Sequence, residues 1–448
     1  MTRTPDAGRP ASLNRTALYC VGAGSVEWYD FFLYATAAAT VFPTLFFADL
    51  GPTGGALASF LTFALAFVAR PLGGLVFGWI GDRTGRRAAL ATGTVTMGAA
   101  TVLIGLLPST AAIGVTAPIL LVVLRLAQGL ALGGQWAGSI LLLTEQAPTG
   151  RRGLYGSIAQ LGSPIGGLVS NALFFLFAAV LSQDAFQSWG WRVPFLLSVL
   201  VIGLGLALQL RLDDSPAFRR ISAASDRSRT PILEVLRTRW TGVLLAGGTF
   251  VAASASLWVF VTFLISYGSK NLGLPQSTML LLVTVTQAFQ MVSIPLASAI
   301  SDRAGRRRVY LIAAVASAVW AFPAFLLIDT GSAVLIAVAL AIAHLILGAM
   351  YGPLAALFSE MFGTRVRYSG ASLGYQLGTV LGGGFAPIVA TALFAASGTS
   401  LSIAAYLVVM SLITVLCVAL VRDMSDRPLD DGGPAAAGPD HPTYSEQR

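Results

Sequence analysis

Charged residues are scarce in this chain of 448 residues: Asp, Glu, Lys and Arg together make up 11% of it, whereas hydrophobic residues make up 55%. Soluble domains carry roughly 25% charged residues, so the composition excludes an ordinary soluble domain and predicts an integral membrane protein in contact with the lipid bilayer. Cysteine is scarce as well. Cys20 and Cys417 both lie in apolar runs, and they offer neither a disulfide framework nor the ligand spacing of a metal site.

The sequence also lacks the motifs of common enzyme classes. It contains no nucleophile elbow, no metal-ligand spacing and no phosphate-binding loop, so we expect no catalytic residues, no metal and no cofactor. The net charge of +8 could indicate a nucleic-acid partner. The arginines, however, cluster at the ends of apolar segments and not on one face. This pattern favours a role in membrane orientation over nucleic-acid binding.

About 20 apolar residues cross the hydrocarbon core of a membrane, and twelve segments of this chain are long enough. They are predicted at 19–45, 56–80, 88–108, 117–143, 154–181, 191–211, 240–266, 277–300, 309–329, 332–357, 369–396 and 400–421. The loops after the even-numbered segments carry most of the arginines, whereas the opposite loops carry only Lys270 and Arg192. By the positive-inside rule, both termini are predicted to be cytoplasmic.

The chain contains an internal repeat. The stretch "GWIGDRTGRR" (Gly78–Arg87) follows the second predicted span, and "SAISDRAGRR" (Ser298–Arg307) follows the eighth. Six spans, a polar linker and six more spans are the layout of a duplicated bundle. The predicted divisions are a cytoplasmic tail at 1–17, a six-helix bundle at 18–212, a cytoplasmic linker at 213–239, a second six-helix bundle at 240–421 and a disordered cytoplasmic tail at 422–448.

The repeated loop predicts a gate at the cytoplasmic face. A carboxylate at a helix end can accept hydrogen bonds from a neighbouring helix N-terminus or pair with arginine, and so hold two helices together. The arginines alone could be orientation anchors, but an acid contributes little to orientation, and two copies at matched positions favour the gate. The candidate gating residues are Asp82, Arg83, Gly85, Arg86, Asp302, Arg303, Gly305, Arg306, Glu145 and Arg151.

The repeated loop resembles the signature loop of the major facilitator superfamily, and "RLAQG" (Arg125–Gly129) resembles its helix 4 motif. The stretches "EWYDFFLY", "FVARPLGG", "RLAQGLALGGQWAG" and "WGWRVPFLLS" are similar to the metabolite:proton symporter family, whose members carry shikimate, 2-oxoglutarate, citrate, or proline and betaine. The resemblance implies an all-α membrane fold of twelve transmembrane helices in two pseudo-symmetric six-helix bundles, active as a monomer in the inner (plasma) membrane of a bacterium. One departure is Gln135, which stands where relatives commonly have glutamate.

Four ionisable residues are predicted at one depth in the first bundle. Glu27 and Asp30 are three residues apart on one face of the first helix, roughly 15 to 20 Å along it, and Arg70 and Arg125 reach a similar depth from other helices. Ionisable groups inside a membrane commonly line a substrate or proton path, because burying them unpaired costs several kcal/mol. A static ion-pair network is the alternative. We assign proton coupling to Glu27, Asp30 and Arg125.

The spans of the second bundle hold almost no formal charge, but they carry aromatic and amide side chains that suit a small, oxygen-rich metabolite. Each of these could instead be an ordinary packing residue, and His344 could be a hydrogen-bonded structural histidine. The candidate substrate-binding residues of the two bundles are Arg70, Arg125, Tyr34, Gln135, Trp258, Gln287, Gln290, His344, Tyr375 and Gln376.

These features predict a secondary active transporter that takes up a small organic acid, such as shikimate or a related carboxylate, together with protons by alternating access. The stretch "LGSPIGG" in the fifth span is one residue short of the antiporter motif of the superfamily, which disfavours an exporter. Three alternatives stay open: an exporter or antiporter of a metabolite or drug, a carrier of a zwitterionic osmolyte such as proline or betaine, and a non-transporting sensor on the same fold.

Overall fold

Helices account for all the regular structure in the part of the chain that the computed structural model describes. That part comprises residues 13–84, 86–133, 135–148, 150–209, 235, 237, 239–362 and 367–421; within it, the side chains at 14, 75, 78–79, 81–84, 86–90, 135–139, 142 and 209 are not described. The predicted tail up to residue 12, nearly all of the predicted linker and the tail from residue 422 lie outside the described residues. The domain divisions there stay predictions.

In the described residues, the first half of the chain forms six successive helical rods, two of which are interrupted near their middle. The long helices are α1 (Leu13–Thr40), α3 (Gly51–Thr84), α4 (Arg86–Leu106), α6 (Thr116–Ala131) continued by α7 (Gln135–Gln146), α8 (Arg152–Gln160) continued by α9 (Gly162–Val180), and α11 (Arg192–Gln209). The short connecting helices are α2 (Phe42–Leu45), η1 (Ala48–Leu50), α5 (Thr110–Ile113), α10 (Gln183–Ala185) and η2 (Phe186–Gly190).

The second half repeats this plan with six further rods. Its helices are α14 (Trp240–Trp258) continued by η3 (Val259–Phe263) and α15 (Leu264–Lys270), α16 (Gln276–Ala304), α17 (Arg306–Ile328), α18 (Ala333–Met361), α19 (Arg367–Gly378) continued by η4 (Thr379–Gly384) and α20 (Ala386–Ser397), and α21 (Leu401–Leu420). The elements η3 and η4 are short π-helices, an irregularity that is frequent at functional sites.

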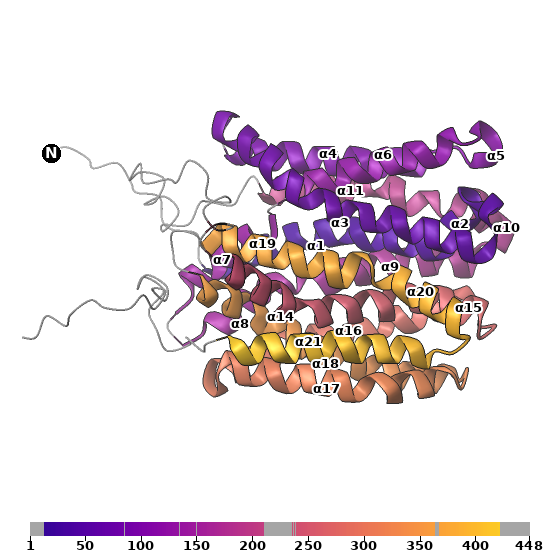
Figure 1. Cartoon of the computed structure of the whole chain (residues 1–448). Coiled ribbons are helices and arrows are strands. Elements are labelled where there is room, and N and C mark those ends of the chain that lie inside the picture. The colour runs from indigo at the N-terminus through magenta and orange to yellow at the C-terminus, as the bar shows by residue number, and fades with distance from the viewer. Residues whose placement is uncertain are drawn as a thin grey trace, which may run out of the picture.

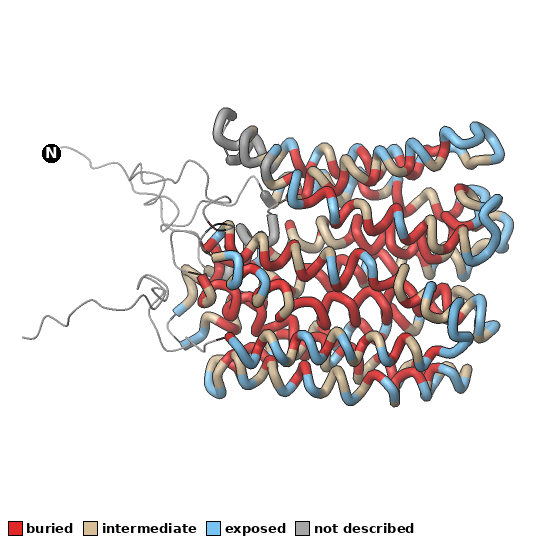
Figure 2. Tube along the Cα trace, in the orientation of Figure 1, coloured by how far each residue is buried: buried red, intermediate tan, exposed pale blue. Residues whose placement is uncertain are grey.

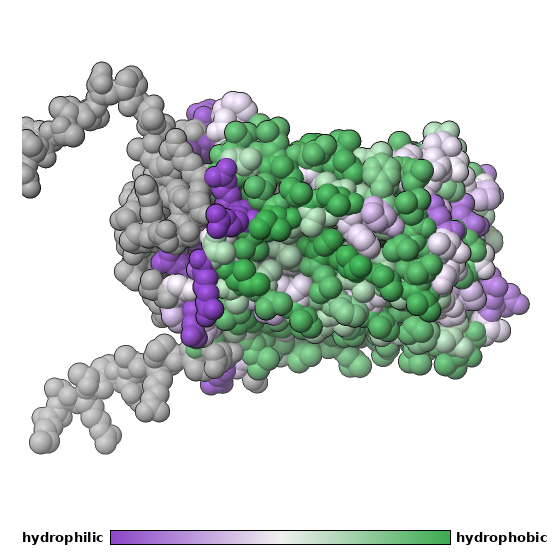
Figure 3. All heavy atoms as spheres, turned by 90° about the horizontal axis from the view of Figure 1, so that it is seen from below, coloured by the Kyte–Doolittle hydropathy of each residue, from purple (hydrophilic) through white to green (hydrophobic). Residues whose placement is uncertain are grey.

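The two halves lie side by side with their rods roughly parallel to one axis (Figure 1). In the described residues, eight helices are long and apolar enough to cross a membrane, and a bent pair, Gln183–Gly190 with Arg192–Leu208, makes a possible ninth. The hydrophobic side chains form a broad band between hydrophilic ends (Figure 3). Counted by rods, the two halves follow the predicted order of twelve helices in two bundles, and this prediction is confirmed. The two ends are called here the α8 end, which is the one predicted to be cytoplasmic, and the α15 end.

Burial is greatest where the two halves meet (Figure 2). The rod Trp240–Lys270 is 94% buried over its apolar window, whereas Leu401–Leu420 at the periphery is 33% buried. A helix that is apolar all round belongs in an interior. The rod that begins with α14 therefore carries its side chains into the centre of the molecule and not into lipid.

Close packing of α3 against α6 positions the polar residues of the first half. A Cβ atom at Gly129 would collide with the backbone oxygen of Ala66, and one at Gly73 would collide with the backbone oxygen of Leu130. Small residues let helix backbones approach each other in this way inside membranes. The contact lies about one helical turn from both Arg70 and Arg125, so it brings the two arginines together.

Candidate functional site

Asp30 and Arg125 are joined by a chain of hydrogen bonds that crosses three helices. The Thr101 hydroxyl of α4 donates to Asp30 Oδ2 of α1 over 2.9 Å, Gln128 Nε2 of α6 donates to Thr101 Oγ1 over 2.7 Å, and Arg125 Nη1 donates to Gln128 Oε1 over 3.1 Å. Each of these four residues has at most 1% of its surface exposed. We refer to them as the relay.

The two arginines share one aromatic ring. The guanidinium carbon of Arg70 lies 3.9 Å from the Phe31 ring centroid, and that of Arg125 lies 4.6 Å from it. Arg125 also lies 3.9 Å from the ring centroid of Tyr34, whose hydroxyl donates to Thr62 Oγ1 over 2.6 Å. Desolvated cation–π contacts of this kind are worth about 2 kcal/mol. The ring faces therefore offset part of the cost of burying two cations.

Several atoms of this cluster have no hydrogen-bond partner among the described residues. They are Nε of Arg70, Nε and Nη2 of Arg125, and Oδ1 of Asp30. Neither arginine forms an ion pair with Glu27 or Asp30 in the described part of the chain. The predicted charges are thus brought together, but rings and neutral relay side chains separate them. Guanidinium N–H groups are left over for another acceptor.

Glu27 and Arg70 face the second half of the molecule. Glu27 is partly buried, and its charge interacts electrostatically with Arg70 and with Tyr375 of α19. Arg70 also interacts electrostatically with Tyr351 of α18. Both tyrosine rings stack on Phe250 of α14, with centroids at 4.7 Å for Tyr375 and 6.0 Å for Tyr351. The predicted site residues of the two halves therefore meet at this level.

The amides and the histidine of the second half are buried, and each has an acceptor atom with no donor in the described residues. These atoms are Oε1 of Gln287, Gln290 and Gln376 and Nε2 of His344. His344 Nδ1 lies 2.9 Å from the Leu340 carbonyl oxygen; a carbonyl only accepts, so Nδ1 carries the hydrogen and Nε2 of the neutral ring is an acceptor. Gln287 presses on the first half, because a Cβ at Gly167 of α9 would collide with its amide nitrogen.

Gln290 and His344 are placed differently from Gln287. Ser293 lies between them, with its hydroxyl 3.4 Å from the Gln290 carbonyl oxygen and 3.5 Å from the His344 carbonyl oxygen. They therefore lie at the packed contact of α16 and α18, within the second half. A hollow lined by Ser256, Phe260, Trp320, Met350 and Leu407, among others, also lies in this half, and it contains none of the predicted binding residues.

Trp258, at the end of α14, joins the halves nearer the α15 end. Its ring lies among four aromatic rings of the first half, with centroid distances of 4.8 Å to Phe63, 5.1 Å to Phe32, 5.9 Å to Phe67 and 6.3 Å to Trp28. Trp258 is eight residues beyond Phe250, or about 12 Å along the helix. The tryptophan therefore closes the contact between the halves on the α15 side of the tyrosines.

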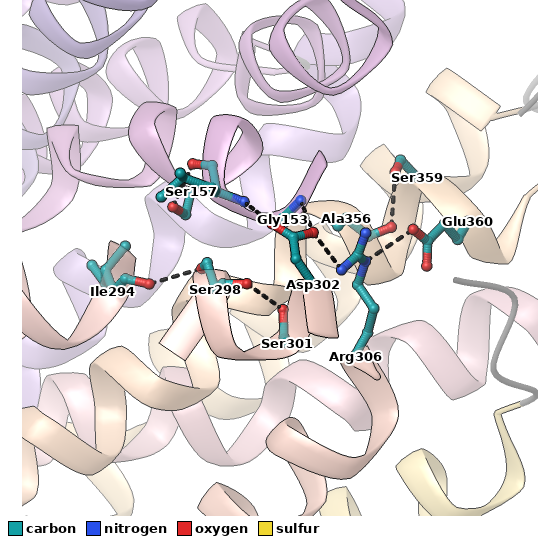
Figure 4. A network of polar contacts seen from close by, with 11 residues as sticks. Gly153, Ser157, Ile294, Ser298, Ser301, Asp302, Arg306, Ala356, Ser359 and Glu360 are labelled. Carbon is teal, nitrogen blue, oxygen red and sulfur yellow. Dashed lines mark hydrogen bonds and ion pairs between the residues drawn. The ribbon is translucent and has the colours of Figure 1, made fainter. Parts of the chain in front are cut away.

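Asp302 joins the halves at the α8 end (Figure 4). The backbone N–H groups of Gly153 and Leu154, in the first turn of α8, donate to its two carboxylate oxygens over 2.8 and 3.0 Å. Arg306 holds the same carboxylate through Nη1 at 2.7 Å and pairs through Nε with Glu360 at 2.9 Å. We refer to this arrangement as the Asp302 latch, and it has the geometry expected for the second copy of the repeated loop.

The other predicted gating residues have different surroundings from one another. Glu145 of α7 pairs with Arg367 of α19 at 3.7 Å, a second contact between the halves. Gly305 has φ +90°, a backbone conformation that favours glycine, and it makes the turn between α16 and α17. Arg151 and Arg303 are exposed. The predictions for Asp82, Arg83, Arg86, Gly85 and Gln135 concern a residue or side chains outside the described part of the chain.

Three residues of the site have only weak sequence signals. Thr101 lies in an apolar helix where threonine is unremarkable, Gln128 lies inside the "RLAQG" stretch next to the predicted arginine, and Phe31 directly follows Asp30. Their importance depends on which neighbouring helix each side chain faces. Apolar periodicity in one segment does not determine this.

The chain matches the family model of the Major Facilitator Superfamily over residues 30–375 and 248–443. It is 38% identical to the inner membrane metabolite transport protein YhjE of Escherichia coli (strain K12) over 418 residues, covering 92% of this chain and 94% of that protein. It is also 38% identical to the shikimate transporter of the same organism over 429 residues, covering 94% and 97%.

A solved structure of the proton:xylose symporter XylE, bound to 6-bromo-6-deoxy-D-glucose, superposes with a TM-score of 0.73 over 93% of this chain and 98% of that chain. The two sequences are 17% identical, so this likeness shows the fold alone. It agrees with the predicted arrangement of helices. The chain belongs to the major facilitator superfamily, and it is a multi-pass membrane transporter and not an enzyme.

Proposed function

We propose that the protein takes up a small hydroxylated carboxylate together with a proton by alternating access. The observation that carries the proposal is a set of buried polar atoms in both halves that have no partner among the described residues. Arg70 and Arg125 of the first half present free N–H donors; in the second half, Gln376 presents a free acceptor, and Gln287 presents both its amide oxygen and its amide nitrogen. A buried polar atom without a partner costs about 1–3 kcal/mol, and a hydroxylated acid would supply partners to both sets.

The chemistry of the two sets fixes the orientation of such a substrate. A guanidinium binds a carboxylate through two parallel hydrogen bonds, so the carboxylate end would lie against Arg125 and Arg70. Hydroxyl groups at the other end would donate to the glutamine oxygens. A cation or an uncharged sugar would leave the guanidinium groups without an anionic partner.

Proton coupling follows from the charge balance of the first half. Two arginines and the ionised forms of Glu27 and Asp30 sum to zero, so protonation of one acid leaves a net positive charge. An anion then binds more tightly after the proton, and by reciprocity the bound anion favours proton binding. We further propose that the protein works as a monomer in the inner membrane of a bacterium, has both termini in the cytoplasm and moves its substrate into the cell.

Transport by the full chain in proteoliposomes tests this function. Radiolabelled shikimate, 2-oxoglutarate, proline, betaine and xylose are offered with the outside acidic, and apparent affinity is followed against external pH. We expect gradient-driven accumulation of a hydroxylated monocarboxylate. Arg125→Gln should weaken its apparent affinity roughly 10- to 100-fold, since a charge-assisted hydrogen bond is worth about 1.5–3 kcal/mol.

Two further variants sharpen this test. Arg125→Lys should fail to restore affinity, because an ammonium keeps the charge but loses the planar fork. Arg308→Gln is the matched control, since it removes an exposed arginine near the α8 end that is not a candidate site residue. Tight binding of a neutral or zwitterionic substrate that is indifferent to pH and to Arg125 would overturn the proposal.

A further inference from the structure

The relay connects the buried acid to the buried arginine through two neutral side chains, and nothing in the predicted site assigns a role to those two. We propose that Thr101 and Gln128 are positioning residues that transmit the protonation state of Asp30 to Arg125. The inference deepens the proton coupling proposed above and rests on it. The observations behind it are the directions of the three hydrogen bonds in the relay and the burial of the four residues that form them.

While Asp30 is ionised, the direction of every hydrogen bond in the relay is determined by chemistry. A guanidinium can only donate, so Gln128 must turn its oxygen toward Arg125 and its NH₂ group toward Thr101. The flipped amide would place donor against donor. Thr101 Oγ1 therefore accepts from Gln128, and its single hydrogen points toward Asp30 Oδ2. All bonds run from the cation toward the anion.

Thr101 has a second acceptor within reach, and this gives the relay two states. Its hydroxyl oxygen lies 2.9 Å from Asp30 Oδ2 and 3.0 Å from the Met97 carbonyl oxygen. While Asp30 is ionised, the charged acceptor holds the hydrogen, because charge-assisted hydrogen bonds are the stronger ones. When a proton binds the Asp30 carboxylate, the acid O–H can donate to Thr101 Oγ1, and the threonine hydrogen turns to Met97.

The change of state reaches Arg125 through polarisation. Hydrogen bonds in a chain strengthen one another, particularly in a medium of low polarity. In the ionised state, the relay therefore holds Arg125 Nη1 firmly against Gln128 Oε1. Protonation of Asp30 reverses the hydrogen bond between Asp30 and Thr101 and weakens the hydrogen bond between Arg125 and Gln128. The guanidinium, whose Nε and Nη2 have no partner among the described residues, is then freer to turn toward a carboxylate.

The charged and titratable groups around Asp30 are compatible with this mechanism. Arg125 of α6 and Tyr29 of α1 interact electrostatically with Asp30; Arg70 of α3 acts on Arg125, and Glu27 acts on Arg70. From α4 the contact is the neutral Thr101. From α11, the Pro194 carbonyl accepts from the hydroxyl of Tyr29, the residue before Asp30. Thr101 is thus the hydrogen-bond partner through which protonation of Asp30 is sensed.

Infrared titration of the purified full chain in lipid tests the relay without any substrate. The carbonyl band of protonated Asp30 is identified as the band that Asp30→Asn removes, and its midpoint is followed against pH. Thr101→Val should move this midpoint to higher pH by about one unit, because the ionised acid loses a charge-assisted hydrogen bond. Thr101→Ser keeps the hydroxyl and should restore the original midpoint.

Gln128→Leu is the decisive variant, because in the described residues Gln128 hydrogen-bonds Thr101 and Arg125 but not Asp30 itself. Transmission through Thr101 predicts a shift in the same direction of roughly half a pH unit, whereas a purely structural glutamine predicts none. Thr144→Val is the matched control: Thr144 is equally buried, and among the described residues its hydroxyl donates only to carbonyls of its own helix.

The outcomes separate this inference from the proposed function. Shifts in Thr101→Val and Gln128→Leu, without a shift in Thr144→Val, support the relay. The inference is overturned if Gln128→Leu keeps the wild-type midpoint, if Thr144→Val shifts as far, or if no band is lost in Asp30→Asn. Failure of every organic acid in the transport assay would overturn the proposed substrate class and leave the infrared result standing.

Discussion

At the scale of single residues, Phe31 is a member of the site although its side chain is neither charged nor polar. Both buried guanidinium groups lie over its ring, and no other described residue contacts both in this way. Phe31→Leu keeps an apolar side chain of similar bulk but removes the π face. We expect apparent substrate affinity to fall about 30-fold, since a desolvated cation–π contact is worth roughly 2 kcal/mol.

The control for this change is Phe60→Leu. Phe60 also lies in the first half and has 1% of its surface exposed, but no arginine of the described residues lies over its ring. Both variants should lose similar thermal stability in detergent. Transport kinetics should separate them, and equal loss of affinity in both would refute a specific role for the Phe31 ring.

The two acids should differ in function, because they differ in surroundings. Asp30 is 1% exposed and is held by the relay, whereas Glu27 is partly buried and interacts with the second half. We predict that Asp30→Asn abolishes gradient-driven accumulation but leaves counterflow exchange of substrate largely intact, since an amide cannot carry the proton. Normal accumulation by Asp30→Asn, measured beside Glu27→Gln, would move the proton site to Glu27 or elsewhere.

The sequence predicts the ionisable members of the site but not their partners. Glu27, Asp30, Arg70 and Arg125 are conspicuous because charge inside an apolar segment is costly. Thr101 cannot be found in this way, since a threonine hydroxyl in a helix can bond a backbone carbonyl of its own preceding turn, as Thr101 can with Met97. Its role depends on the rotation of α4 against α1, which is a property of packing.

At the scale of elements, the Asp302 latch joins a helix end of one half to a helix beginning of the other. A carboxylate at a helix N-terminus is favoured by the helix dipole and by free N–H groups. Asp302→Asn should lower the turnover rate several-fold by weakening the closed contact at the α8 end, with little change in apparent substrate affinity. The measurement is initial transport rate against substrate concentration.

The nearby Arg308→Gln serves as the control for the latch, because Arg308 is exposed and is not a candidate gating residue. An unchanged turnover rate with reduced affinity in Asp302→Asn would contradict a gating role. Asp82→Asn, in the first copy of the loop, is predicted to have the larger effect. The second copy has Ser298 where the first has a glycine, which makes it the weaker match.

We predict that Gly129, at the contact of α3 and α6, is required for full thermal stability. Gly129→Ala would force a Cβ atom against the Ala66 backbone, and such overpacking costs about 1–3 kcal/mol. Gly203→Ala is the matched control: Gly203 also lies in a helix, but a Cβ there meets nothing within 4 Å. Thermal unfolding in detergent should show a lower midpoint for the first variant and an equal or higher midpoint for the second.

Helix existence is predictable from the sequence, but helix continuity is not. The fourth predicted span, 117–143, is interrupted between α6 and α7, and the seventh, 240–266, contains the π-helix η3. Apolar length determines that a segment crosses the membrane. A local break instead depends on contacts with other helices, such as that of η4 with α3.

At the scale of the whole molecule, the internal repeat predicts two bundles, and the structure contains them. The repeat does not predict how the bundles face each other, because both copies of the loop carry the same signals. The structure distinguishes them: it is Trp258 of the second half that enters an aromatic cluster of the first. The site is therefore formed by side chains that differ between the two halves, and the symmetry of the repeat does not predict them.

The halves touch through an ionic contact at the α8 end and through an aromatic contact nearer the α15 end. These two kinds of contact respond differently to the medium. Apolar burial weakens on cooling, whereas the ion pair of the latch, whose side chains are 3% and 5% exposed, is screened little by dissolved salt. Cooling therefore acts on one end of the protein far more than on the other, and an experimenter who changes only the temperature can bias which end opens first without changing a single residue.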